Sequence, residues 1–422
     1  MTLYGESRIR YLRFIKNIGM NKLLIAFIVL LIAGCKSGPD SGNEKVYCMS
    51  LEGLYMVKNA IENNDPAIQV SYTKLLKQAD KALLAGPFSV MQKNNIPPSG
   101  NKHDYFSVPP YSGTGDGLTN PRWYFDYDRV PLEKLTQSLE TLALAYFFTG
   151  EQKFARRAVV LIREWFLNPE TSMNPDLEFA QASTWVGVID TRFLSRIIDC
   201  IGLLEKTGYW NKEDQELMVE WCRQFMKNVQ NRTDKEHMNR GNNISSWYHV
   251  QMASIAFFIG DTVMAKTMIE RTKARIDSAL NTSGGFKEEL TRARSLSYSC
   301  FHSFALFNLA SMGERVGIDL WNYKTTDGRG FQQALEYISM HSGVGNAKKW
   351  PHKEIEGTKD DYWKPFYDML PSVLYHAAVV YDNEDFDVLA RQIPGERFEE
   401  FRIHVMCGLP LRWFSTISYP AD

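Results

Sequence analysis

The sequence Phe147-Phe148-Thr149-Gly150-Glu151 separates two stretches in which apolar residues recur every three or four positions, at 135–146 and at 154–165. Such spacing is typical of amphipathic helices. The sequence Phe257-Phe258-Ile259-Gly260-Asp261 repeats the pattern between two further helical stretches. Because a glycine breaks the periodicity in each case, each sequence predicts a turn between two antiparallel helices.

Helical periodicity continues along the rest of the chain, and strand signals are scarce. Further helices are predicted at 193–204, after a cap at Asn211, and at 296–316, 331–340 and 371–381. Repeated antiparallel helix pairs predict an all-α fold, an (α/α) toroid in which helix hairpins form an incomplete barrel. An open solenoid of helix pairs is the alternative. The stretch 100–131, rich in Pro, Gly, Tyr and Asp, predicts a long ordered loop that serves as a lid.

The N-terminus predicts a lipoprotein signal over residues 1–35. Its apolar run, 23–33, is shorter than the ~20 residues of a membrane span and has the length of a signal-peptide core. Ile32-Ala33-Gly34-Cys35 resembles a bacterial lipobox, so we expect cleavage before Cys35 and lipidation of that residue. A cleaved soluble secretion signal is the alternative, and Met20 is a second possible start. A tether over 36–50 and one toroid domain over 51–422 would follow.

Composition excludes several classes of function. The chain has 48 basic and 49 acidic residues, so its net charge of −1 offers no general attraction for nucleic acid. Five cysteines follow Cys35, and an odd number argues against a disulfide framework and predicts buried free thiols. The chain has no Cys-x-x-Cys pair, no His-Glu-x-x-His and no Gly-rich phosphate loop, so we predict no metal and no cofactor.

Two stretches about fifty residues apart carry groups suited to one kind of chemistry. Asn242-Asn243 and His249 lie where one helix begins, and Arg292 and Tyr298 lie where another begins. Amides and a guanidinium can hold a carboxylate and stabilise the enolate-like dianion that forms when the adjacent proton leaves. A phenol near a cation can remove that proton. The pattern therefore indicates β-elimination in an acidic polysaccharide.

Each of these residues also has a purely structural interpretation. One asparagine would cap the helix, which leaves the second for a ligand, and His249 could be either a cleft residue or an ordinary helix residue. A six-residue spacing puts Arg292 and Tyr298 roughly 120° apart on an ideal helix, so they meet only if Arg292 lies at or before the helix start. We predict eight substrate-binding residues: Asn242, His302, Tyr105, His103, Trp123, Gln181, Trp247 and Arg240. The aromatic ones would stack on sugar rings unless they belong to the core.

Several motifs occur together in the order of a known family. They are His103-Asp104-Tyr105-Phe106-Ser107, the segment 174–182, Asn242-Asn243 with Trp247, Glu289-Leu290-x-Arg292 with Ser295-Leu296-Ser297-Tyr298, and Gly317-Ile318-Asp319-Leu320-Trp321. On these motifs the chain resembles the alginate lyase superfamily of α/α-toroid polysaccharide lyases, similar to polysaccharide lyase families 5 and 38, over about residues 100–355.

The resemblance implies that Asn243 and Arg292 hold the substrate carboxylate and that Tyr298 is the catalytic phenol. One position departs from the family, because the histidine expected after the second asparagine is Ile244. We predict that His249, or as second choice His302, takes over part of its role. With Tyr298 as both base and acid, elimination is syn, which fits mannuronate in alginate and gives 4,5-unsaturated uronate ends; glucuronan is the alternative substrate.

Two functions of other classes compete with this prediction. A glycoside hydrolase would need two carboxylates that flank the bond, for which Glu288, Glu289, Asp126 and Asp128 are candidates. A non-catalytic glycan-binding lipoprotein would be consistent with the loss of the histidine. Our prediction is a monomeric lyase of the periplasm or outer-membrane surface of a Gram-negative bacterium. Its partner would be an acidic polysaccharide, and only the lipid anchor would touch the membrane.

Overall fold

The computed structural model describes residues 44–109, 116, 126–181, 183–355, 369–393 and 398–409. Within these ranges the chain is helical and its only β-structure consists of isolated bridges. The main helices are α3 (Leu51–Glu62), α4 (Pro66–Ala82), α6 (Arg129–Thr149), α7 (Gln152–Ile162), α9 (Leu194–Leu204), α10 (Lys212–Arg232), α12 (Asn243–Phe258), α13 (Thr262–Ala279), α14 (Ser295–Arg315), α15 (Phe331–Met340), α17 (Leu370–Tyr381), α18 (Glu384–Gln392) and α19 (Phe398–Met406). Shorter helical elements are η1 (Val90–Gln92), η2 (Arg163–Leu167), α8 (Thr184–Gly187), η3 (Thr191–Phe193), α11 (Lys235–Met238) and η4 (Glu289–Thr291).

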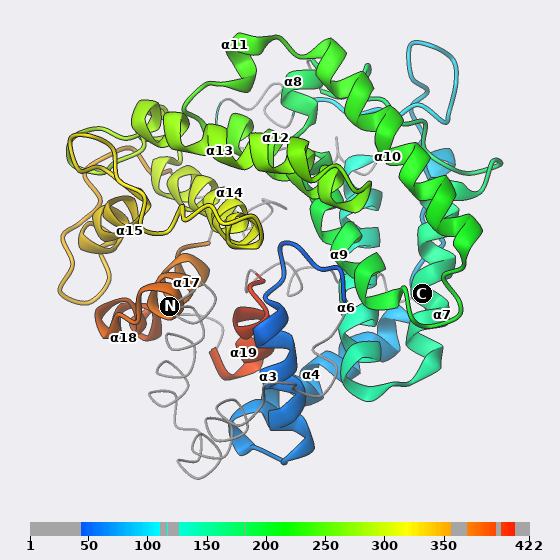
Figure 1. The fold of residues 1–422 in the computed structure, drawn as a ribbon, viewed down its shortest axis with the longest axis horizontal. Coiled ribbons are helices and arrows are strands. Elements are labelled where there is room, and N and C mark those ends of the chain that lie inside the picture. Colours follow the sequence, from blue (N-terminus) through cyan, green and yellow to red (C-terminus); the bar gives the residue numbers. More distant parts are fainter. Residues whose placement is uncertain are drawn as a thin grey trace.

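The helices form a ring, as Figure 1 shows. Around it α6 contacts α9, α9 contacts α12, α12 contacts α14 and α14 contacts α17; α17, α19 and α4 then lead back to α6. Antiparallel partners pack alongside, with α7 on α6, α13 on α12, α15 on α14 and α18 on α17. The predicted α/α toroid of helix hairpins is confirmed.

Charge explains which helices lie inside the ring. Helix α12 has no charged residue, and α14 has none before Glu314. All eleven residues of α9 are buried. By contrast, α10 and α13 bury one face and expose charged residues on the other. A helix without a polar face can avoid water only if neighbours cover it on all sides, so α12 and α14 take inner positions. Helix α9 is equally buried because its two charged residues, Arg196 and Asp199, have partners inside the fold.

The predicted helix ends are confirmed. Gly150 and Gly260 have φ of 73° and 84°, a region that glycine enters without a steric penalty, and each ends a helix of a hairpin. Asn211 caps α10 by accepting a hydrogen bond from the Asp214 N–H (2.8 Å), and the Asp214 carboxylate accepts one from the Asn211 N–H (3.0 Å). The five cysteines after Cys35 are free and buried, as predicted.

The segment just before α3 is part of the core. The N–H groups of Tyr47, Cys48 and Met49 all donate to the buried carboxylate of Asp199 on α9, at 2.6, 2.9 and 2.6 Å. Val46 is fully buried. Residues 46–49, which the sequence assigned to the tether, therefore belong to the folded domain, because the N–H groups of residues 47–49 are satisfied inside it.

The first part of the predicted lid loop is ordered by contacts with its own end. The Phe106 N–H donates to the Asp128 carboxylate (2.8 Å), which also lies 3.0 Å from the buried Lys93 ammonium. Residues 110–115 and 117–125, with Trp123, lie outside the described part of the chain, as do residues 1–43 with Cys35. None of the helices in the described part is both long and apolar enough to cross a bilayer.

Candidate active site

The two asparagines lie at the first turn of α12. Asn242 is the N-cap, and its side-chain oxygen accepts a hydrogen bond from the Ser245 N–H (3.1 Å). Gly241 precedes it where α12 begins against the end of α13: a Cβ on Gly241 would lie 2.8 Å from Ala279 Cα, so only glycine fits. Capping thus accounts for Asn242, as one interpretation of the sequence predicted.

The start of α14 is held by the segment 351–355. The Ser295 N–H donates to the Lys353 carbonyl (3.0 Å), and the Ile355 N–H donates to the Ala293 carbonyl (2.9 Å). Glu354 accepts hydrogen bonds from the Leu296 N–H and the Ser297 hydroxyl, both at 2.6 Å. A carboxylate is favourable there because the N-terminal end of a helix carries partial positive charge.

Arg292 and Tyr298 are in contact, and Arg292 lies before the helix start, as the predicted contact requires. Arg292 has an extended backbone and lies three residues before α14. The angle that would separate the two side chains on a continuous helix therefore does not apply. Its guanidinium carbon lies 3.9 Å from the centre of the Tyr298 ring. This is a cation–π contact between the two residues that the sequence proposed for proton removal and carboxylate binding.

Asp116 binds the other side of the same guanidinium. Its carboxylate accepts from Arg292 Nε (3.2 Å) and Nη2 (2.7 Å) and from the Ala293 N–H (3.0 Å). Burial alone would raise the pKa of Asp116, but the hydrogen bonds from Arg292 and Ala293 lower it below its usual value. The planar guanidinium of Arg292, which binds the Asp116 carboxylate in this way, has the geometry to bind the carboxylate of a substrate.

The two helix starts are joined through the turn η4. Asn242 Nδ2 donates to Glu288 (3.1 Å), while Asn243 donates to Glu289 through both its backbone N–H (2.7 Å) and its Nδ2 (2.8 Å). Arg292 follows Glu289 by three residues. The fold therefore brings both asparagines, Arg292 and Tyr298 to one edge of the ring, where α12 and α14 begin.

His249 does not join this group. It is fully buried, and its Nδ1 lies 2.8 Å from the Ser245 carbonyl one turn earlier in α12. Burial and the nearby Arg275 lower the pKa of His249 well below its usual value, which favours the neutral ring. His302, the second choice, is the histidine with a connection to the site: its Nε2 lies 2.8 Å from the Ser246 hydroxyl and its Nδ1 lies 3.3 Å from Glu289.

A profile of the alginate lyase family matches residues 89–350. The chain belongs to the alginate lyase family. The crystal structure of an alginate lyase from Bacteroides ovatus is similar, with 27% identity and a TM-score of 0.76 over 86% of this chain and 99% of that chain. Alginate lyase A1-III from Sphingomonas species A1, in a histidine-to-alanine form complexed with a tetrasaccharide, shares the fold at 16% identity and a TM-score of 0.53, over 84% of this chain and 96% of that chain. No match is found among curated proteins.

The lyase buries two of the aromatic residues that the sequence proposed for sugar stacking. Trp247 is 4% exposed and packs on Phe301 with ring centres 5.2 Å apart, and Tyr105 is 1% exposed. Both rings pack inside the hydrophobic core, which favours the core interpretation of both. Helix α12 is covered on every side, and periodicity alone could not show that.

The remaining predicted binding residues lie at different places in the lyase. Gln181 donates to Asp190 (2.5 Å) and so joins the loop before α9, and His103 Nδ1 lies 2.7 Å from the Ser172 carbonyl. Arg240 is exposed beside the asparagines and lies 3.3 Å from Glu288. Of these three, only Arg240 is connected by a described contact to the group around Asn243.

The roles of Asp116 and Glu289 could not be predicted from the sequence. Glu289 stands in the motif with Arg292, but its partner lies 46 residues away, and Asp116 lies 176 residues from Arg292. The carboxylates proposed for a hydrolase have structural partners: Asp128 pairs with Lys93, and Asp126 accepts from Asn94 (2.7 Å). In the described ranges no three His, Cys, Asp or Glu residues are grouped to hold a metal ion.

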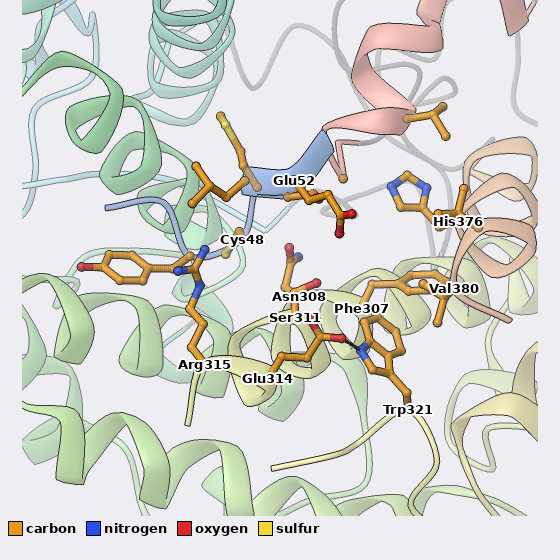
Figure 2. A pocket seen from close by; sticks show the side chains of 17 residues that line it. Cys48, Glu52, Phe307, Asn308, Ser311, Glu314, Arg315, Trp321, His376 and Val380 are labelled. Atoms are coloured by element: carbon orange, nitrogen blue, oxygen red, sulfur yellow. Dashed lines mark hydrogen bonds between the residues drawn. The ribbon is translucent and has the colours of Figure 1, made fainter. Parts of the chain in front are cut away.

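A cavity of about 130 Å³ lies at the other end of α14. Figure 2 shows Glu52 and His376 on one side of it, with Asn308 and Glu314 on the other. Glu314 lies sixteen residues after Tyr298, which is about 24 Å along a helix. The cavity is therefore separate from the group around Tyr298.

Proposed function

We propose that this lyase cleaves mannuronate-rich alginate by syn β-elimination. The observation that carries the proposal is the Arg292 guanidinium, 3.9 Å from the centre of the Tyr298 ring. A neighbouring cation favours the phenolate, which is a strong base. The same cation can bind the carboxylate next to the proton that leaves. The name of the Bacteroides ovatus structure, an alginate lyase, supports alginate as the polymer.

In the proposed reaction Tyr298 removes the proton at C5 of the uronate, and the bond between C4 and the glycosidic oxygen breaks. The phenol then returns the proton to the leaving oxygen. Arg292 and Asn243 stabilise the negative charge that develops on the carboxylate, and the N-terminal ends of α12 and α14 add partial positive charge. The products are a new sugar end and a 4,5-unsaturated uronate.

Mannuronate follows from the use of a single proton-transfer group. When one phenol serves as both base and acid, the C5 proton and the leaving oxygen must lie on the same face of the sugar, as they do in mannuronate. Anti elimination of guluronate would need a second group on the opposite face. Ile244 cannot supply one, and His249 is fully buried. Glucuronate has the mannuronate configuration at C4 and C5, so glucuronan is the alternative substrate.

The test is an activity screen of the wild type and Tyr298→Phe on polymannuronate, polyguluronate, glucuronan and pectate, read by the ultraviolet absorbance of the unsaturated product. We expect polymannuronate to be cleaved fastest and Tyr298→Phe to lose activity by roughly 10³-fold. Circular dichroism would confirm that the variant is folded. A variant that keeps the wild-type rate would refute the role of Tyr298, and saturated reducing ends would indicate a hydrolase.

We also propose that the lyase is attached to a membrane, in the periplasm or at the outer surface, through a lipid on Cys35. The lipobox-like sequence supports this. In the part of the chain that the structure describes, the first buried residues are 46–49, so the tether that we propose runs from residue 36 to residue 45. Cys35→Ser should move the protein from the membrane fraction to the soluble fraction and abolish labelling by a fatty-acid analogue. Labelling that persists in the variant would contradict the anchor.

A further inference from the structure

A continuous chain of buried polar side chains lies behind Asn243. We call Arg275, Ser246, His302 and Glu289 the Glu289 network; each is at most 3% exposed. Arg275 Nη1 lies 2.8 Å from the Ser246 hydroxyl, which lies 2.8 Å from His302 Nε2. His302 Nδ1 faces Glu289 at 3.3 Å, and Glu289 accepts both hydrogen bonds from Asn243. The proposed role of Asn243 does not by itself require these four residues.

The protons of the network can be assigned from its two ends. Arginine can only donate, so the Ser246 hydroxyl accepts from Arg275. A carboxylate can only accept, so a neutral His302 ring carries its proton on Nδ1, which faces Glu289, and its Nε2 accepts from the Ser246 hydroxyl. Burial lowers the pKa of His302, and the ring is stacked on Phe286 with centres 4.3 Å apart, which both suit the neutral form. Every donor in the chain thus points toward the Glu289 carboxylate.

This direction determines how Asn243 is held. An ionised carboxylate accepts but cannot donate, so Asn243 must turn its Nδ2 toward Glu289 and its side-chain oxygen away. The backbone bond to the other oxygen of Glu289 holds the start of α12 in the same place. A carboxylate so close to a site for an anionic sugar is electrostatically unfavourable. Arg275, at the far end of the chain, offsets that charge.

We infer that Glu289, backed by His302, Ser246 and Arg275, is the positioning residue that orients the Asn243 amide toward the substrate carboxylate. The inference rests on the proposed function, in which Asn243 stabilises charge that develops during the reaction. Because a misdirected amide loses charge stabilisation mainly in the transition state, the loss should fall on kcat more than on KM.

Three variants test this inference on the polymer that the wild type cleaves. Glu289→Gln keeps size and shape but presents an N–H₂ group to Asn243, so the amide can turn over; we expect kcat to fall about 50-fold with little change in KM. Glu289→Asp keeps both acceptor oxygens and should retain more activity than Glu289→Gln. Glu140→Gln removes another buried carboxylate, paired with Arg196 at 2.9 Å on the inner helices, and should lower stability without lowering kcat.

The outcomes separate the two proposals. If the wild type makes no unsaturated product from any polyuronate, the proposed function fails and the role of Glu289 fails with it. If the wild type is active and Tyr298→Phe is not, but Glu289→Gln keeps the wild-type kcat, only the positioning role is overturned. A loss in Glu289→Gln that equals the loss in Glu140→Gln, or that appears in KM alone, would also overturn it, because either result would indicate a general structural effect.

Discussion

The two ends of helix α14 differ in a way that explains where an anionic polymer can bind. At its start, Arg292 lies against Tyr298, and the adjacent backbone carries the partial positive charge of a helix N-terminus. At its other end, a cavity is lined by the carboxylates of Glu52 and Glu314. The cavity is also lined by Arg315, whose guanidinium offsets part of their charge. The direction of the helix therefore distinguishes its two ends for an anionic ligand.

For the comparison of the two ends of α14, the largest difference should come from replacing one arginine at each end. Arg292→Lys keeps the charge but removes the planar fork that binds a carboxylate and stacks on Tyr298. We expect kcat/KM to fall roughly 100-fold, measured by product absorbance. Arg315→Lys, at the cavity end, should leave the rate close to wild type. Equal losses in the two variants would remove the distinction between the ends.

The next effect concerns stability at the cavity end. Burial lowers the pKa of His376 to about 4, whereas an unfolded chain has about 6.5. As pH falls below 6.5 the unfolded state takes up this proton first, so the folded state loses stability, by about 1 kcal/mol between roughly pH 7.5 and 5.5. His376→Gln should remove that part of the pH dependence of urea unfolding. If the pH dependence stayed the same, His376 would not be its source.

A smaller effect should appear when two helix caps are compared. Asn242→Ala and Asn211→Ala each remove a side-chain cap, from α12 and α10, and each should lower the free energy of unfolding by about 1 kcal/mol. Only Asn242→Ala should also lower kcat/KM, because α12 begins at the proposed site. Chemical denaturation and product absorbance measure the two quantities. A rate loss of the same size in Asn211→Ala would show that the effect comes from stability alone.

The smallest effect should come from Asp116. Its carboxylate holds the Arg292 fork that a uronate would use, in an ion pair whose side chains are 39% and 29% exposed. The Asp116 carboxylate therefore competes with a uronate for Arg292. Asp116→Asn should weaken this competition and lower KM about threefold at low salt, with kcat nearly unchanged. Initial rates over a range of substrate concentrations would measure both. A lower kcat at constant KM would show instead that Asp116 orients Arg292 for the reaction.

The helix hairpins could be predicted because their causes are local. Gly150 and Gly260 end helices through their own backbone freedom, and Asn211 caps α10 through a contact three residues away. The contact between Arg292 and Tyr298 could be predicted conditionally, because it requires only that Arg292 precede the helix. Contacts between residues a few positions apart can therefore be predicted from the sequence.

The environment of single side chains on the inner helices could not be predicted in the same way. His249 and Trp247 stand on a helix that is covered on all sides, so its spacing does not show which face meets the cleft. The choice between His249 and His302 depends on Glu289, which lies in another turn of the chain. Periodicity identifies a helix, but it does not identify the neighbours that the helix meets in the fold.

The sequence by itself determined the all-helical hairpin pattern, the family resemblance and the three groups suited to elimination, because these depend on residue type and on spacing within a few turns. Tertiary structure alone decided that Asp116 holds Arg292, that Glu289 holds Asn243 and that His249 is buried. Those contacts join residues far apart in the chain, and they form only when the ring of helices brings the starts of α12 and α14 together.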